Sequence, residues 1–131
     1  MVILDTNIII DHLRQHAQES LLMKLEKQYS KARLCVSIIS IQELYEGRST
    51  IQREKEDQLL SVVTPLKICA YSFEIATLAG KIARDLGIGH PIDIADAAIA
   101  ATAIVNHCEL VTLDQKDFLK IPGLSLHPLF S

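Results

Sequence analysis

Short apolar runs typical of β-strands alternate along this chain with longer segments whose apolar residues recur at helical spacing. The first run, Val2–Leu4, is followed at once by Asp5, Thr6 and Asn7, which are residue types that begin helices. This alternation predicts a central parallel sheet with helices on both faces, a three-layer α/β/α fold. The other predicted strands are Leu34–Val36, an edge strand from Val62–Val63 and Leu66–Cys69 around Pro65, Leu110–Thr112, and a short Leu124–Leu126.

The helical segments carry start and stop signals. Ser40 and Glu43 have the spacing of a capping box, which predicts that a helix begins there. Gly87 predicts a left-handed cap at the end of the helix that begins at Ser72. The predicted helices are Ile8–His16, Ser20–Lys31, Ser40–Gly47, Ser72–Leu86 and Ile94–Val105, with a solvated charged face at Arg48–Asp57 and a loop at Gly89–Pro91.

Length and composition fit one domain, residues 1–131, with a compact core, since 49% of the residues are apolar and 22% are charged. No apolar run approaches the roughly 18 residues of a membrane span. The first residues lack the basic flank and cleavage site of a signal peptide, so we expect a cytoplasmic protein without a membrane contact. Cys35, Cys69 and Cys108 form no CxxC pair, which favours buried free thiols over disulfides or a zinc ribbon.

The net charge of −3 and the pI of about 5.9 are unusual for a protein that binds nucleic acid by charge alone, because such proteins are normally basic. The acidic balance does not exclude a nuclease whose carboxylates bind metal ions. In such an enzyme the cation supplies the positive field that the chain lacks.

Asp96 is the only charged residue between Ile94 and Val105, and small apolar residues surround it. A buried carboxylate without a partner is costly or becomes protonated, so a cation should face this one. The alternative is structural: Asp96 would interact with the free N–H groups of the first helical turn, with Asp93 as the N-cap.

Asp5 and Asp114 each follow a predicted strand directly. The carboxyl ends of parallel strands share one edge of a sheet, where ligands bind, so the two side chains should converge if their strands are neighbours. Asp is also a common residue in turns and helix caps, which is the alternative role of both. Glu43 has its own local alternative, a hydrogen bond to the backbone within the capping box.

Electrostatics favours a metal site if these carboxylates meet. Two carboxylates about 4 Å apart repel by about 4 kcal/mol at an effective dielectric constant near 20. Several in one place would stay ionised only beside cations, and hard ions such as Mg²⁺ or Mn²⁺ prefer oxygen ligands. Two such ions about 3.5–4 Å apart activate water and stabilise the leaving oxygen in phosphodiester cleavage. The pattern therefore favours phosphoryl transfer.

These segments together resemble the PIN-domain family, and in particular toxin ribonucleases of the VapC type. The likeness covers nearly the whole chain, with its segments in the family's order. The segments that carry it are Ile3–Asn7, Ser40–Leu44 with Gly47, Asp96–Ala103, and Leu110–Asp114 with Asp117 and Phe118.

The resemblance implies Mg²⁺- or Mn²⁺-dependent cleavage of RNA, a type II toxin–antitoxin pair, a homodimer, and an antitoxin that blocks the site. It implies attack by a metal-bound hydroxide, with a second metal at the departing 3′ oxygen. Asp117 would be a reserve ligand, and Asp93 a helix cap. By matching segments, the metal-binding acidic quartet would be Asp5, Glu43, Asp96 and Asp114, with Thr6, Asn7 and Thr112 orienting the carboxylates.

Basic residues that could hold the RNA backbone are Arg14, Arg48, Arg53 and Lys116, although each also fits an ordinary solvated side chain. His12 and His16 have the spacing of a helical metal pair, but no further ligand completes a zinc site, so solvent exposure is expected.

Two other functions fit part of the pattern. An aspartate-based phosphatase would need a second Asp where Asn7 stands, and a phospho-receiver domain would need an acidic pair before the first helix. Neither pattern is complete. An inactive PIN-like module that binds proteins would have no reason to keep an intact acidic quartet.

Overall fold

The central sheet is parallel, as predicted. The computed structural model describes residues 1–15, 18–87 and 92–129, and within these ranges the sheet has four strands in the order β3-β2-β1-β4. Ile3 of the central β1 lies opposite Cys35 of β2 and Leu110 of β4. The strands are β1 (Val2–Leu4), β2 (Leu34–Ser37), β3 (Lys67–Cys69) and β4 (Glu109–Val111).

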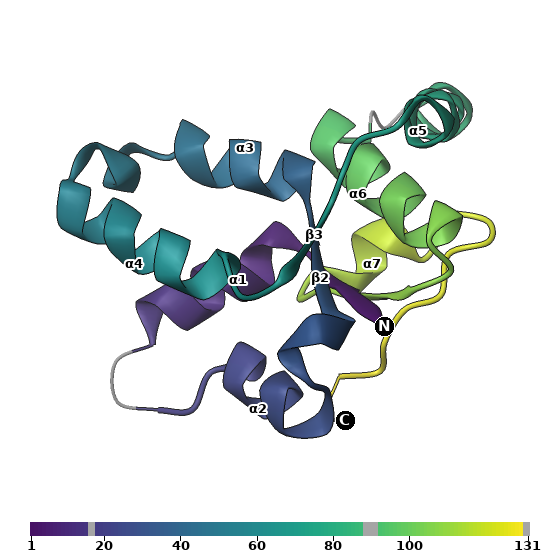
Figure 1. Cartoon of the computed structure of the whole chain (residues 1–131). Coiled ribbons are helices and arrows are strands. Elements are labelled where there is room, and N and C mark those ends of the chain that lie inside the picture. Colours follow the sequence, from purple (N-terminus) through teal and green to yellow (C-terminus); the bar gives the residue numbers. More distant parts are fainter. Residues whose placement is uncertain (16–17, 88–91, 130–131) are drawn as a thin grey trace.

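Helices cover both faces of this sheet, so the predicted three-layer α/β/α fold is confirmed (Figure 1). Alternate side chains of β1 point to opposite faces, as the pleat of a strand requires. Ile3 packs in one buried cluster with α5 and α6, whereas Val2 and Leu4 pack in another with α1, α2 and α4. The helices are α1 (Thr6–Arg14), α2 (Leu21–Gln28), α3 (Ile38–Glu46), α4 (Arg53–Val63), α5 (Phe73–Leu86), α6 (Ile94–Val105) and α7 (Gln115–Phe118), with 3₁₀ turns η1 (Lys31–Arg33) and η2 (Arg48–Ile51).

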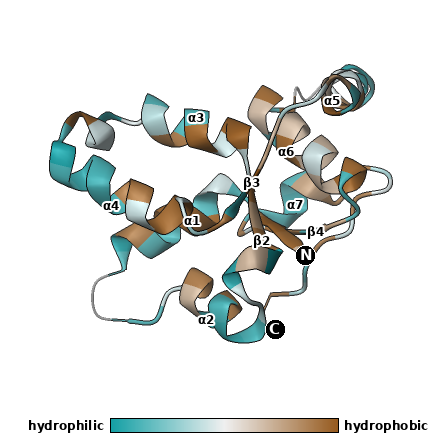
Figure 2. Ribbon diagram, viewed as in Figure 1, coloured by the Kyte–Doolittle hydropathy of each residue, from teal (hydrophilic) through white to brown (hydrophobic). Residues whose placement is uncertain are grey.

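The Ala-rich α6 is the helix most deeply enclosed in the core. Every residue from Ala97 to Ala103 is buried, and the helix packs between the sheet and α5. Small side chains allow this close approach on most sides of the helix. Figure 2 shows the apolar strands at the centre of the molecule and hydrophilic outer faces on the helices. The buried part of α6 therefore begins directly after Asp96, which is half-buried in the first turn.

One predicted helix start and one predicted strand are wrong for reasons of tertiary packing. The Ser37 hydroxyl caps α3 by accepting from the Ile39 N–H at 3.1 Å, because β2 runs directly into the helix. The predicted capping box at Ser40 therefore does not form. Val63 is buried at the end of α4, so the predicted edge strand loses its first part and only β3 remains.

Three smaller expectations fail at turns and at one histidine. Gly87 has a right-handed conformation (φ −81°), so it is no left-handed cap. The predicted strand at Leu124–Leu126 is reduced to one bridge between Leu110 and Leu126. His12 is half-buried, with its Nδ1 2.6 Å from the Ser20 hydroxyl. His16 and the predicted Gly89–Pro91 loop lie outside the described residues.

The three cysteines are free and buried, as predicted. Across the described ranges, none of the helices combines the length and the apolar character that crossing a bilayer requires.

Candidate active site

Asp5 lies at the carboxyl end of β1 and caps α1. Its Oδ1 accepts from the Thr6 backbone N–H at 2.7 Å, and its Oδ2 accepts from the Thr112 hydroxyl at 2.7 Å. Only 5% of the residue is exposed. Burial raises its pKa; the two hydrogen bonds oppose this rise, and the Glu43 and Asp114 carboxylates add to it. Asp5 is thus a firmly oriented carboxylate in a negative surrounding.

Asp96 lies in the first turn of α6 with no partner for its carboxylate. The helix is capped by Asp93, whose Oδ1 accepts from the N–H groups of Ala95 (2.8 Å) and Asp96 (3.3 Å), so the predicted cap is confirmed. No hydrogen bond or ion pair reaches the Asp96 side chain within the described residues. Burial, followed by the carboxylates of Asp5, Asp93, Glu43 and Asp117, raises its pKa to about 7.

Glu43 reaches the same region from α3. Its Oε1 accepts from the Thr6 hydroxyl at 2.6 Å, and that hydroxyl also lies 2.9 Å from the hydroxyl of the fully buried Ser40. A carboxylate can only accept, so the single proton of Thr6 points to Glu43 and Ser40 donates to Thr6. The hydroxyls therefore orient Glu43, which has no role in capping.

Asp114 follows β4 and is held by Asn7. The Asn7 amide donates to the Asp114 Oδ2 at 3.4 Å and to the Thr112 hydroxyl at 3.3 Å, while its carbonyl accepts from the Leu113 N–H at 3.3 Å. The Thr112 hydroxyl also accepts from the Asp114 N–H at 3.0 Å. The expectation that Thr6, Asn7 and Thr112 orient the carboxylates is confirmed as geometry.

The four predicted acids are gathered at the carboxyl edge of the sheet, where each contributes to an open negative cluster. Asp5 is affected by Glu43 and Asp114, and Asp96 by Asp5 and Glu43. Within the described part of the chain, no three carboxylate, imidazole or thiol groups already form a closed set of metal ligands. The acids converge, but they do not surround one point.

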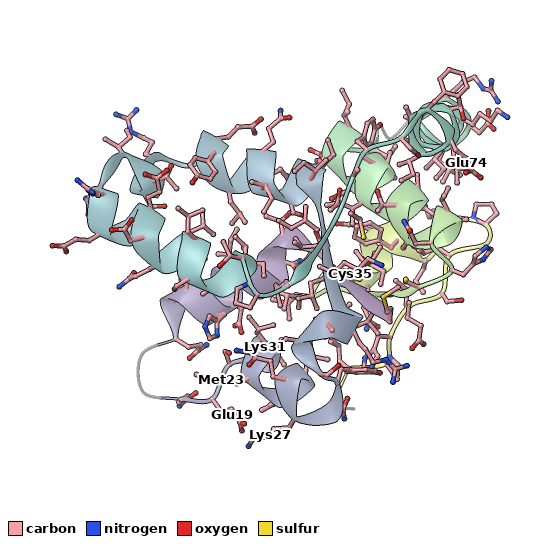
Figure 3. All side chains as sticks on the ribbon, in the orientation of Figure 1. Glu19, Met23, Lys27, Lys31, Cys35 and Glu74 are labelled. Atoms are coloured by element: carbon pink, nitrogen blue, oxygen red, sulfur yellow. The ribbon has the colours of Figure 1, made fainter. Side chains whose placement is uncertain are left out.

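The ion pairs identified in the described part of the chain do not include any of these four acids. The ion pairs found there are Lys27–Glu19 and Lys31–Glu26 around α2, and Arg84–Asp85 at the end of α5. Figure 3 labels Glu19, Lys27 and Lys31 beside α2, on the side of the molecule opposite α3 and α6. Carboxylates with raised pKa values in a cavity are typical of functional sites.

Three cavities border the acids. One of about 530 Å³ includes Glu43 in its lining, and one of about 340 Å³ includes Asp96 and Asp117. A third, of about 940 Å³, is lined in part by Asp114 and Asp117. Glu43, Asp96 and Asp114 thus border open space, whereas the buried Asp5 lines none of these three cavities.

The basic residues predicted to hold RNA divide into two groups. Arg14 and Arg48 line the cavity that contains Glu43, and Lys116 lines the two other cavities. Arg53 lines none of the three. Lys120, which sequence reasoning missed, lies beside Lys116 in the cavity of Asp96. Lys120 lies just beyond the end of α7 (Gln115–Phe118), and its closeness in sequence to Lys116 was the available signal.

Comparison with known proteins agrees with this geometry. The family model described as "PIN domain" matches residues 2–124. Ribonuclease VapC1 of Methanocaldococcus jannaschii is 32% identical over 130 residues, which cover 96% of this chain and 86% of the relative.

Solved structures give the same result. VapBC2 from Rickettsia felis bound to a DNA fragment from its promoter matches with a TM-score of 0.77 and 29% identity, over 96% of each chain. DNA-bound VapBC from Salmonella typhimurium matches with a TM-score of 0.84 over 97% of this chain and 98% of the other. At 24% identity this second match supports the fold alone.

Proposed function

This chain belongs to the PIN-domain family, and from that premise we propose that it is a metal-dependent endoribonuclease and the toxin of a type II toxin–antitoxin pair. One observation carries the proposal. Acidic side chains from four separate elements converge at one sheet edge, and the Asp96 carboxylate among them has no partner in the described residues, with a pKa raised to about 7. A divalent cation bound among these groups would offset their mutual repulsion and keep them ionised.

We propose Mg²⁺, or Mn²⁺ in its place, as the ion. The donor set consists of carboxylate oxygens, which hard divalent ions prefer. Asp117 is the reserve ligand, beside Asp96 in the same cavity. When bound, the ion would make water a nucleophile near neutral pH and would neutralise charge on the leaving oxygen. The ligands would be Asp5, Glu43, Asp96 and Asp114.

The side chains around the acids keep their oxygens in place. Thr112 holds the Asp5 carboxylate through its Oδ2, Thr6 holds Glu43, and Asn7 holds Asp114. Thr6 and Asn7 belong to the first turn of α1, and Thr112 directly follows β4. Two neighbouring elements at the carboxyl edge of the sheet therefore orient the three acids. Such preorganisation removes the need to reorient the carboxylates during the reaction.

The proposal includes partners and location. The substrate is RNA, since the VapC1 relative is named a ribonuclease, and the protein partner is an antitoxin, since the R. felis relative was solved as VapBC2. We propose a single domain over residues 1–131, a homodimer as in the family, and a cytoplasmic location, where RNA is made. Light scattering that shows only monomer at all concentrations would contradict the proposed homodimer.

The test is cleavage of generic single-stranded RNA by the full chain with Mg²⁺ or Mn²⁺. We expect cleavage that stops with EDTA and is lost in Asp5→Asn and Asp96→Asn. A matched control is Asp57→Asn, an exposed acid on α4, which should cleave like the wild type. Undiminished cleavage in EDTA would contradict the proposal. Turnover of p-nitrophenyl phosphate without RNA cleavage would favour a phosphatase, and neither activity would favour an inactive binding module.

A further inference from the structure

Three cations from three elements line the cavity next to Glu43. Arg14 comes from the end of α1, Arg48 from η2 and Lys55 from α4, and all three are exposed. No hydrogen bond or ion pair of their charged groups is found in the described part of the chain. The helices α1, α3 and α4 that frame this cavity lie together on one side of the molecule (Figure 1). We call this cavity the α3–α4 groove.

We propose that the α3–α4 groove binds the phosphate backbone of single-stranded RNA next to the scissile phosphate, an inference that rests on the proposed ribonuclease function. Glu43 lines the groove and also affects the pKa of Asp5 and Asp96, so the groove leads directly to the acidic cluster. An RNA chain bound at the acidic cluster would therefore continue into the α3–α4 groove along the protein surface.

Charge is the argument for a polyanion as the occupant. The whole chain carries a net charge of −3, and the acidic edge repels phosphates until cations are bound. Three cations in one groove provide the attraction that the acidic centre lacks. Each one that neutralises a phosphate releases a counterion, which favours binding and makes it depend on salt.

The lining also indicates how the RNA is recognised. Leu44 and Leu59 at the floor are buried, and Ser49 and Gln58 at the rim can donate to phosphate or sugar oxygens. None of the lining side chains described is aromatic, so bases have no stacking surface there. The groove therefore binds backbone, and its contribution to affinity does not depend on base sequence.

The measurement is fluorescence anisotropy of a fluorescein-labelled single-stranded RNA with the full chain in the Asp96→Asn background, in EDTA, over a series of KCl concentrations. We expect Arg14→Ala, Arg48→Ala and Lys55→Ala each to weaken binding. Each should also reduce the slope of log Kd against log salt by about 0.7, and the triple variant by about 2. Arg48→Lys, which keeps the charge, should retain the slope.

Arg53→Ala is the matched control, because Arg53 lies on the same helix as Lys55 but outside the groove. It should retain the parent's affinity and salt slope. The proposal is overturned if the three groove variants keep the parent's Kd and slope, as they would if the groove bound a peptide, or if Arg53→Ala loses as much as Lys55→Ala.

The binding assay and the cleavage assay distinguish a failure of the groove proposal from a failure of the proposed ribonuclease function. Wild-type cleavage with unchanged binding in the variants would overturn only the groove. The predicted salt slopes without any wild-type cleavage would overturn only the ribonuclease. Circular dichroism of each variant checks that these exposed substitutions leave the fold intact.

Discussion

Asp96→Asn should have opposite effects on stability without and with metal. In the folded chain the pKa of Asp96 rises from 3.8 to about 7, mainly through burial and the neighbouring carboxylates. Each unit of pKa shift corresponds to about 1.4 kcal/mol, so ionising Asp96 in the folded chain would cost about 4 kcal/mol of folding free energy if the whole shift applied. Because the residue is only partly buried, solvent screens this cost, and we expect about 1–2 kcal/mol.

The sign follows from proton linkage. The folded pKa lies above that of the unfolded chain, so the contribution of Asp96 favours folding most below pH 3.8 and is lost as the pH rises through about 7. In EDTA at pH 8, Asp96→Asn should therefore be more stable than the wild type by about 1–2 kcal/mol. Near pH 4 this advantage should almost disappear, because the wild-type carboxyl is then largely protonated in the folded chain.

The assay is urea unfolding followed by far-ultraviolet circular dichroism, since the chain has no Trp to serve as a fluorescent probe. Saturating Mg²⁺ should stabilise the wild type through mass action and Asp96→Asn much less, which reverses the order seen in EDTA. Asp57→Asn should follow the wild type in both conditions. An Asp96→Asn protein that is less stable than the wild type in EDTA at pH 8, or that gains equally from Mg²⁺, would refute the reasoning.

Three further predictions concern the supports of the site and the core. Thr112→Val removes the hydroxyl that holds Asp5 and should cost about 1.5–3 kcal/mol of unfolding free energy as well as most of the cleavage; unchanged urea midpoints would contradict it. Asp114→Asn should reduce kcat far more than Asp117→Asn if Asp117 is only a reserve ligand, and equal kinetic losses would assign both to the site. Ile99→Ala in the buried face of α6 should cost about 2–5 kcal/mol in the same unfolding assay, and a loss under about 1 kcal/mol would mean that the helix repacks.

Local patterns along the chain predicted the elements well where no distant partner competed. The Asp93 cap, the α6 helix and the strands around Ile3 and Leu110 follow from capping chemistry and apolar runs alone. The wrongly predicted boundaries lie where the local sequence is compatible with two structures. Val63 has a strand-forming side chain, but the core beneath α4 buries it in a helix, and burial outweighs a propensity of less than about 1 kcal/mol.

Sequence by itself predicted which carboxylates would come together, because a lone Asp in an Ala-rich helix loses hydration on folding, and an Asp directly after a parallel strand lies at the ligand-binding edge of the sheet. The tertiary structure alone decided what those carboxylates contact. Glu43 had a capping role available three residues away, yet it accepts instead from Thr6, 37 positions distant. Likewise, Arg14, Arg48 and Lys55 share a groove only because three helices meet there. The physical reason is that a carboxylate or a cation binds whichever partner the packed backbone brings within about 3 Å, whatever their separation along the chain.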